Sequence, residues 1–165
     1  GGRVTRRVYM DHWQRSAGFI GAFHPEKDFM KQLNTALLVD DDFATNYLHK
    51  MVIEDHGSFK NIAEAYDGQE AIDYLTTKLD GEYPRPDIIF LDINMPRMDG
   101  WEFLEAYADL PEECKGGAVI AMLTTSLNPD DKERSQQYGC VQCFENKPLD
   151  LEKLDRLIKI ILPGT

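Results

Sequence analysis

The fold of this chain is decided by residues 88–100, which read IIFLDINMPRMDG. The first four residues are apolar and rich in β-branched and aromatic side chains, which is typical of a central strand of a parallel sheet, buried on both faces. Pro96 and the Asp99-Gly100 pair then predict a turn. Asp92 therefore stands where the strand ends, at the carboxyl edge of the sheet, where open α/β folds bind their ligands.

The composition is that of an ordinary globular domain. The 165 residues are enough for one domain with a core. Of them, 42% are hydrophobic and 28% are charged, which is ordinary for a globular protein. The formal net charge of -11 argues against direct binding of nucleic acid or an anionic membrane, because both need a basic protein face. No apolar run reaches the roughly 20 residues that span a bilayer, so no membrane insertion is expected.

The three cysteines are an odd number, which fits a reducing compartment, expected to be the cytoplasm, better than a disulfide framework. Cys140 and Cys143 have the spacing of a redox pair. We favour the alternative that both are small apolar residues at the start of a strand, because no helix N-terminus follows directly to lower a thiol pKa. No second CxxC pair exists to complete a zinc site.

The N-terminal segment differs from the rest of the chain. Residues 1–34 carry scattered arginines and aromatics without a regular pattern. We expect them to be an N-terminal extension or a leader introduced for expression, with Met30 as a possible natural start. Residues 35–162 are expected to form one domain.

From residue 35 onward, short continuous apolar runs alternate with stretches in which apolar residues recur at helical spacing. The pattern predicts strands over residues 36–39, 61–66, 88–92, 118–123 and 141–145. Helices are predicted over residues 43–56, 69–78, 101–109, 128–138 and 151–162, with a loop over 111–117. His49 and His56, on the first of these helices, are expected to be exposed. Alternating strands and helices predict an α/β fold, a doubly wound five-stranded parallel sheet with helices on both faces.

Each strand end delivers a characteristic residue to the carboxyl edge. The residues are Asp40 and Asp41 after the first strand, Asp92 at the third, Thr124 at the fourth and Lys147 after the fifth. In a flavodoxin-like strand order of 2-1-3-4-5, the first and third strands are neighbours, so the three carboxylates converge. Taken singly, the acidic triplet would be an exposed turn and Lys147 a solvated loop lysine.

Converging carboxylates repel one another, and one would take up a proton unless a cation were present. Mg²⁺ fits because it binds carboxylate oxygens and needs few protein ligands. A carboxylate beside such an ion suggests phosphoryl chemistry, because aspartyl phosphates are known covalent intermediates. Lys147 would neutralise charge on the transferring oxygens, and Thr124 would donate a hydrogen bond to one of them.

Four motifs in the expected order resemble one family. LVDD at 38–41, LDINMPRMDG at 91–100, LTT at 123–125 and NKP at 146–148 are together similar to the receiver domain of two-component response regulators, of the stand-alone, chemotaxis-regulator-like kind. The resemblance covers about residues 35–162, and the strand order given above is partly borrowed from it.

The resemblance implies a role for each matching position. Asp92 would be the phosphoacceptor, Asp41 a direct Mg²⁺ ligand (with Mn²⁺ as an alternative ion), and Asp40 a ligand through water. The backbone carbonyl of Asn94 would be the remaining protein ligand. Lys147 would contact the phosphoryl group, and the Lys147-Pro148 bond is one that the family often holds in the cis form.

The resemblance also implies a switch. Thr124 would move toward the phosphoryl group and Phe144, which lacks the hydroxyl of the frequent tyrosine, would rotate inward. The alternative is that Phe144 is ordinary packing. Asn94 and Ser126 occupy the variable positions where the family tunes phosphoryl lifetime.

The expected function is therefore a phosphoacceptor switch without an output domain in the chain, and not a turnover enzyme. The phosphoryl donor would be a sensor histidine kinase or a histidine phosphotransfer protein, and an unknown downstream protein would read the result. One alternative is a phosphatase of the haloacid-dehalogenase type, but that chemistry needs an acid–base aspartate where this chain has Asn94. Another is a receiver-like module that is never phosphorylated, against which the intact acidic and lysine set argues.

Overall fold

The computed structural model describes residues 32–162, and its centre is one five-stranded parallel sheet in the order β2-β1-β3-β4-β5. The strands are β1 (Leu33–Val39), β2 (Phe59–Ala65), β3 (Ile88–Asp92), β4 (Val119–Thr124) and β5 (Val141–Asn146). The predicted fold class and strand order are confirmed. β1 starts earlier than the predicted residue 36, because Leu33 already pairs with Phe59 of β2.

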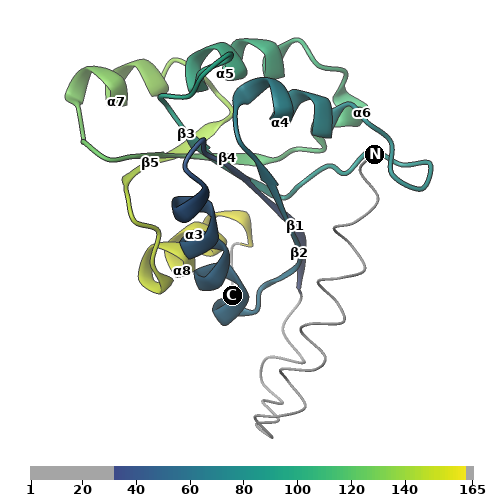
Figure 1. The fold of residues 1–165 in the computed structure, drawn as a ribbon, viewed down its shortest axis with the longest axis horizontal. Coiled ribbons are helices and arrows are strands. Elements are labelled where there is room, and N and C mark those ends of the chain that lie inside the picture. Colours follow the sequence, from purple (N-terminus) through teal and green to yellow (C-terminus); the bar gives the residue numbers. More distant parts are fainter. Residues whose placement is uncertain (1–31, 163–165) are drawn as a thin grey trace, which may run out of the picture.

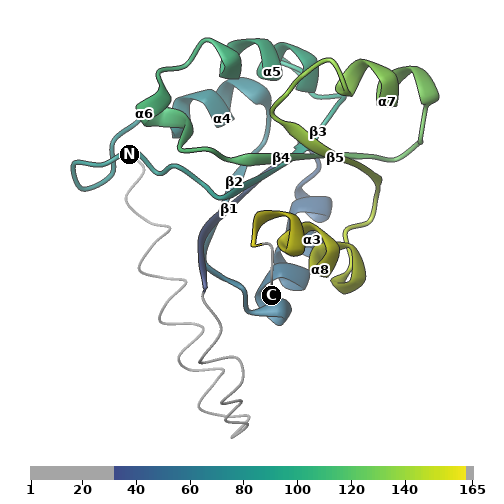
Figure 2. The ribbon, with the colours of Figure 1, turned by 180° about the vertical axis from the view of Figure 1, so that it is seen from behind.

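Helices cover both faces of this sheet. On one face lie α3 (Phe43–His56) and α8 (Leu151–Ile161), and on the other lie α4 (Gly68–Leu75), α5 (Gly100–Ala108) and α7 (Pro129–Ser135) (Figures 1 and 2). The short α6 (Glu112–Lys115) occupies part of the predicted loop over 111–117. The helices predicted over 69–78 and 128–138 are shorter in the structure, ending at Leu75 and Ser135.

Local sequence signals set the helix ends. The Asp42 side chain caps α3 by accepting a hydrogen bond from the Ala44 N–H, and Gly57 ends the same helix with a φ of 76°, a left-handed conformation that favours glycine. Asp99 and Glu102 form a capping box at the start of α5. Each capping aspartate follows a strand, so the helices start close to the carboxyl edge of the sheet.

Alternation along the strands divides the core into two layers. Leu37, Ile89 and Met122 pack toward α4 and α5, whereas Leu38 and Phe90 pack toward α3 and α8. All five side chains are at most 2% exposed. Burial on both faces gives the central strands their continuous apolar sequence, and it fixes the register that brings their ends to one edge.

The two cysteines of the CxxC sequence lie on opposite faces of the sheet. Cys140 packs against the layer under α4 and α5, and Cys143 packs against the layer under α3 and α8. Both are free thiols. This packing agrees with the interpretation of both cysteines as small apolar residues.

One face of α3 differs from the sequence prediction. His49 is only 3% exposed, so the expectation that it lies at the surface was wrong. The inward face of α3 carries Asn46 and His49 together with Ile53, because it passes backbone groups of Asp40 and Leu149 that need hydrogen-bond partners.

Two further sequence predictions concern the chain ends and membranes. Most of the proposed N-terminal extension, residues 1–31, lies outside the described residues, so the boundary after residue 34 stays a prediction. Between residues 32 and 162, every helix is too short or too polar to cross a bilayer.

Candidate functional site

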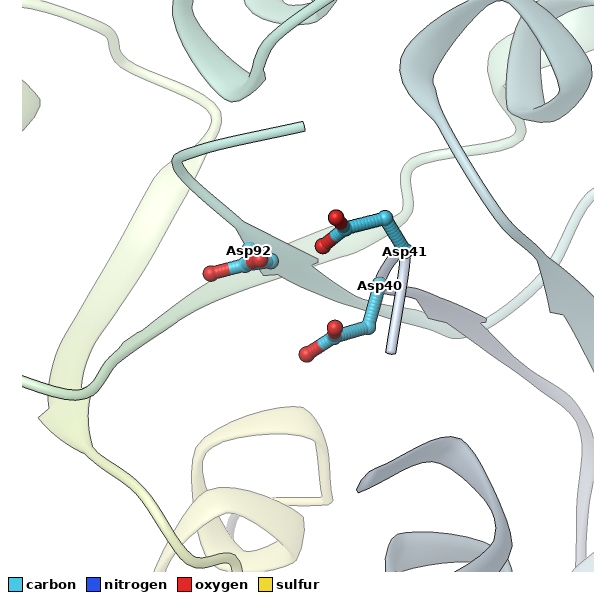
Figure 3. Close-up of side chains that lie close together, drawn as sticks. All are labelled: Asp40, Asp41 and Asp92. Atoms are coloured by element: carbon cyan, nitrogen blue, oxygen red, sulfur yellow. The ribbon is translucent and has the colours of Figure 1, made fainter. Parts of the chain in front are cut away.

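Three carboxylates from two strands meet at the carboxyl edge of the sheet. Asp40 and Asp41 follow β1, and Asp92 ends β3 (Figure 3). Each offers an oxygen within 4.8 Å of an oxygen of the other two. Asp40 and Asp92 are buried, whereas Asp41 is exposed. The convergence expected from the strand order is thus present, in a site that opens to solvent on the Asp41 side.

The turn after β3 is shaped so that α5 can start directly behind Asp92. The Gly100 N–H donates to the Ile93 carbonyl at 2.7 Å. A Cβ atom at Gly100 would lie only 2.5 Å from the Asp92 carbonyl oxygen, so only glycine allows this close approach. The Asp99-Gly100 pair therefore does more than mark a turn, because it fixes the backbone that carries Asp92.

Lys147 joins the two buried carboxylates. Its Nζ lies 2.5 Å from Asp40 Oδ2 and 3.1 Å from Asp92 Oδ1. The Lys147 backbone N–H donates to the Thr124 carbonyl at 2.6 Å, and the bond to Pro148 is cis, as the resemblance implied. The ammonium group thus lies within 3.1 Å of a carboxylate oxygen from each of the two segments.

The charges at this site shift the pKa values of Asp92 and Lys147. Burial and the neighbouring Asp40 carboxylate raise the pKa of Asp92, with Lys147 acting in the other direction. Burial opposes the charged form of Lys147, but hydrogen bonds and charges from Asp40 and Asp92 outweigh it and raise the pKa of Lys147. At neutral pH, Lys147 is a fixed positive charge beside two carboxylates.

The donor set fits a hard divalent cation. It consists of carboxylate oxygens with one exposed member, which suits Mg²⁺, an ion that keeps several of its waters. Three carboxylates and one ammonium carry an excess of negative charge. After burial, repulsion by Asp40 is the second cause of the raised pKa of Asp92. A cation here would relieve that repulsion.

The other predicted residues lie around this cluster. Thr124 ends β4, is buried, and donates from Oγ1 to the Ser126 carbonyl at 3.0 Å. Phe144 is on β5, partly buried against the layer under α4 and α5. Asn94 follows β3 and is exposed. The structure gives these positions; the roles of the three residues remain predictions.

Several contacts at the site were missed from the sequence. Arg97 Nε pairs with Asp67 Oδ2 at 2.6 Å, and the Gly68 N–H donates to the Met98 carbonyl at 2.9 Å, so the turn after β3 is held against the start of α4. In the sequence, the Asp67-Gly68 pair has the composition of a turn, but in the structure it forms the N-terminus of α4.

Asn46 and His49 were also missed. Asn46 donates to the Asp40 carbonyl at 3.0 Å, and the Leu149 N–H donates to His49 Nε2 at 3.2 Å. Polar residues at positions i and i+3 of a helix share one face, and this spacing was the signal available in the sequence. Both side chains contact the segments that carry Asp40 and Lys147.

Proteins of similar sequence include response regulators. The family model of the response regulator receiver domain matches residues 36–159. The response regulator Rre1 of Synechocystis sp. is 32% identical over 127 residues, which cover 76% of this chain but only 50% of Rre1. The response regulator Rcp1 of the same organism is 32% identical over 126 residues, covering 74% of this chain and 82% of Rcp1.

Solved structures share the fold. A two-component response regulator from Cytophaga hutchinsonii superposes with a TM-score of 0.70 at 27% identity, covering 80% of this chain and 98% of that one. The phosphorylated cyanobacterial phytochrome response regulator RcpA superposes with a TM-score of 0.64, also at 27% identity, covering 81% of this chain and 96% of RcpA.

Proposed function

The chain belongs to the response regulator receiver domain family, and on this basis we propose that it is a phosphoacceptor switch that takes a phosphoryl group onto Asp92. The observation that carries the proposal is the meeting of the Asp40, Asp41 and Asp92 carboxylates with the Lys147 ammonium at one edge of the sheet. Such a set can bind a cation and a phosphoryl group next to a nucleophilic carboxylate.

Mg²⁺ is the cation we propose for this site, with Asp41 and Asp92 as direct ligands. Asp40 would act through water, and the Asn94 backbone carbonyl would complete the protein ligands. When bound, the ion would neutralise charge on the phosphoryl oxygens during transfer. Asp40 also pairs with Lys147, which holds the ammonium group close to the position that the phosphoryl group would take.

The reaction that we propose is transfer from a phosphohistidine. A carboxylate oxygen of Asp92 attacks phosphorus, forming a P–O bond, while the P–N bond to the donor imidazole breaks. The electron pair of that bond stays on the imidazole nitrogen, which takes up a proton. Both polar contacts of the Asp92 carboxylate within residues 32–162, from Lys147 Nζ and the Ile93 N–H, go to Oδ1, so we assign Oδ2 as the attacking atom.

The response to phosphorylation would involve Thr124 and Phe144. In the structure, Thr124 Oγ1 donates to the Ser126 carbonyl, and a phosphoryl oxygen on Asp92 would compete for that hydroxyl. Movement of Thr124 would leave space at β4 that Phe144, on the adjacent β5, can fill. Because α7, β5 and α8 border these residues, their surface would differ between the two states and be read by a downstream protein.

The donor would be a sensor histidine kinase or a histidine phosphotransfer protein. The outward face of α3, which starts directly after the acidic cluster, carries four exposed apolar side chains, Phe43, Tyr47, Leu48 and Met51, each at least 49% exposed. A contiguous exposed apolar patch is typical of a protein contact site. We propose that the donor docks there and presents its histidine to Asp92.

The test is labelling by a small phosphodonor such as acetyl phosphate, with Mg²⁺ and with a chelator. We expect Mg²⁺-dependent incorporation in the wild-type chain and none in Asp92→Asn. Asp109→Asn is the matched control, because Asp109 is an exposed aspartate at the far end of α5, and it should label like the wild type. Labelling of Asp92→Asn at the wild-type level would overturn the proposal.

A further inference from the structure

Two buried polar side chains of α3 lie beneath the site, and the chemistry proposed above does not use them. Asn46 is 1% exposed and His49 is 3% exposed. Asn46 Nδ2 donates to the Asp40 carbonyl at 3.0 Å, and His49 Nε2 accepts from the Leu149 N–H at 3.2 Å. Buried polar groups of this kind are conspicuous on a helix whose outward face is apolar, because burial favours apolar side chains.

The contact made by His49 reaches the segment that carries Lys147. That segment, residues 146–149, is held at three points. First, the Lys147 N–H donates to the Thr124 carbonyl at 2.6 Å. Second, Lys153 Nζ donates to the Asn146 and Pro148 carbonyls at 2.9 Å each, and third, the Leu149 N–H donates to His49. The first contact belongs to the sheet and the second comes from α8. The third ties the segment to α3, which also holds Asp40 through Asn46.

The protonation state of His49 follows from the geometry. Because Nε2 accepts a hydrogen bond from a backbone N–H, the ring is neutral and carries its proton on Nδ1. Burial lowers the pKa of His49 to about 4; Asp40 opposes this shift, and the ammonium groups of Lys147 and Lys153 add to it. His49 is therefore a neutral acceptor throughout the physiological range of pH.

We propose that His49 is a positioning residue for phosphoryl transfer: by accepting the Leu149 hydrogen bond, it sets the place of the Lys147 ammonium group relative to Asp40 and Asp92. This inference rests on the proposed function, because it assigns His49 a part in the same reaction. His49 acts through the backbone two residues after Lys147, at the Leu149 N–H.

The test compares His49→Leu, which has no acceptor, with His49→Gln, whose Oε1 can accept from the Leu149 N–H. Initial rates of labelling by acetyl phosphate are measured at saturating Mg²⁺, and Mg²⁺ affinity is measured separately. We expect His49→Leu to lower the rate between about 10-fold and about 100-fold, since misplacement by about 1 Å can reduce a rate about 100-fold. Mg²⁺ affinity should stay near the wild-type value, because Lys147 is not a cation ligand, and His49→Gln should regain most of the rate.

A double-mutant cycle asks whether His49 acts through Lys147. In a Lys147→Met background, His49→Leu should cause no further loss of rate, because the group that it positions is absent. An equal proportional loss in both backgrounds, an unchanged rate in His49→Leu, or a Gln variant no better than Leu would overturn the proposal.

A measurement on the wild-type chain covers the case in which His49→Leu does not fold. Nitrogen NMR of the His49 ring at neutral pH should show the neutral tautomer with the proton on Nδ1; a proton on Nε2 would overturn the proposal. If the wild-type chain itself takes no label, the proposed function fails, and this inference fails with it. If the wild type labels at Asp92 but the His49 variants behave like it, only the role of His49 fails.

Discussion

Lys147 and Asp92 form an ion pair of 3.1 Å, although their strands, β5 and β3, are separated in the sheet by β4. The pair can form because Lys147 lies past the end of β5, where the chain reaches back across the edge of the sheet and is tied to β4 by the Lys147–Thr124 backbone hydrogen bond. The ammonium group is therefore held over the carboxylates by the backbone as well as by charge.

Replacement of Lys147 tests its part in transfer separately from cation binding. Lys147→Met should lower the labelling rate at least about 10-fold, because no positive charge then faces the transferring oxygens. Mg²⁺ affinity should not fall, since the three carboxylates proposed to bind the ion remain. Lys132→Met, which removes an exposed lysine of α7, is the control and should leave the rate unchanged. A Lys147→Met rate equal to that of the control would contradict the role of Lys147.

Asp92→Asn should make the fold more stable at neutral pH when Mg²⁺ is absent. Burial and Asp40 raise the pKa of Asp92, so the native state binds this proton more readily than the unfolded chain does. Stability from Asp92 is thus present in acid and lost as pH rises through the raised pKa. The asparagine, which never ionises, should raise Tm at neutral pH by about 2–4 °C, the shift that about 1 kcal/mol produces in a domain of this size.

The pH dependence checks this reading of Asp92. Thermal unfolding of the wild type and Asp92→Asn is followed by circular dichroism at several pH values with a chelator present. The difference in Tm should shrink as pH falls and the wild-type carboxyl becomes protonated. If Asp92→Asn is less stable than the wild type at neutral pH, or if the difference grows in acid, the cost of ionising Asp92 that burial and Asp40 impose is absent.

The stability that Asp67 contributes should depend on pH in the opposite direction. Burial opposes ionisation of Asp67, but its hydrogen bonds with Arg97 and with backbone N–H groups outweigh burial and lower its pKa. A carboxyl group whose pKa is lower in the native state than in the unfolded chain stabilises the fold at pH values above its unfolded pKa. This stability is lost as pH falls through the native pKa. Asp67→Asn should therefore lower Tm at neutral pH, and the difference should close in acid. The loss in free energy of unfolding should be less than about 1 kcal/mol, because Arg97 is exposed.

Asp67→Ala separates the ion pair from the helix cap. The Asp67 side chain also accepts from the Glu70 N–H at the start of α4, and asparagine can keep this contact whereas alanine cannot. Loss of an N-cap costs about 1 kcal/mol, so Asp67→Ala should unfold at a lower temperature than Asp67→Asn at every pH. Equal Tm values for the two variants would show that the cap contributes nothing.

The exposed apolar face of α3 predicts a difference between protein and small-molecule donors. Tyr47→Ala, a change at a side chain that is 57% exposed, should slow transfer from a phosphorylated kinase or phosphotransfer protein about 10-fold, which corresponds to about 1.4 kcal/mol of docking energy. Labelling by acetyl phosphate should be unaffected. Ile160→Ala, on α8, removes a comparably exposed residue (46%) and is the matched control; equal slowing in both variants would place docking elsewhere.

Much of this arrangement could be predicted from the sequence because the pattern of apolar residues and the turn-forming residues carried the information. Continuous apolar runs identified the central strands, and Asp92 could be placed at the carboxyl edge because a turn signal follows it directly. The convergence of Asp40 with Asp92 needed the strand order, which came in part from the resemblance to a family. Once that order was assumed, neighbouring strand ends had to meet.

The parts that were not predicted depend on tertiary contacts. The apolar spacing of α3 does not identify its inward face, because Phe43 and Tyr47 are exposed. His49 is buried because a backbone N–H on a distant segment needs an acceptor. Its spacing from Asn46 indicates a shared helix face, but not that this face is buried. Likewise, the Arg97–Asp67 pair joins two turns that are remote in sequence, so neither residue alone indicated it.

The most direct test of the central claim, that Asp92 accepts a phosphoryl group beside a cation held by its neighbours, is to map the modified residue. The chain is phosphorylated by acetyl phosphate with Mg²⁺ or with a chelator, reduced with borohydride to convert an aspartyl phosphate to homoserine, and sequenced by mass spectrometry. We predict homoserine at position 92 in the Mg²⁺ sample and aspartate there in the chelator sample. Homoserine at another aspartate, or at position 92 in equal amount without Mg²⁺, would contradict the claim.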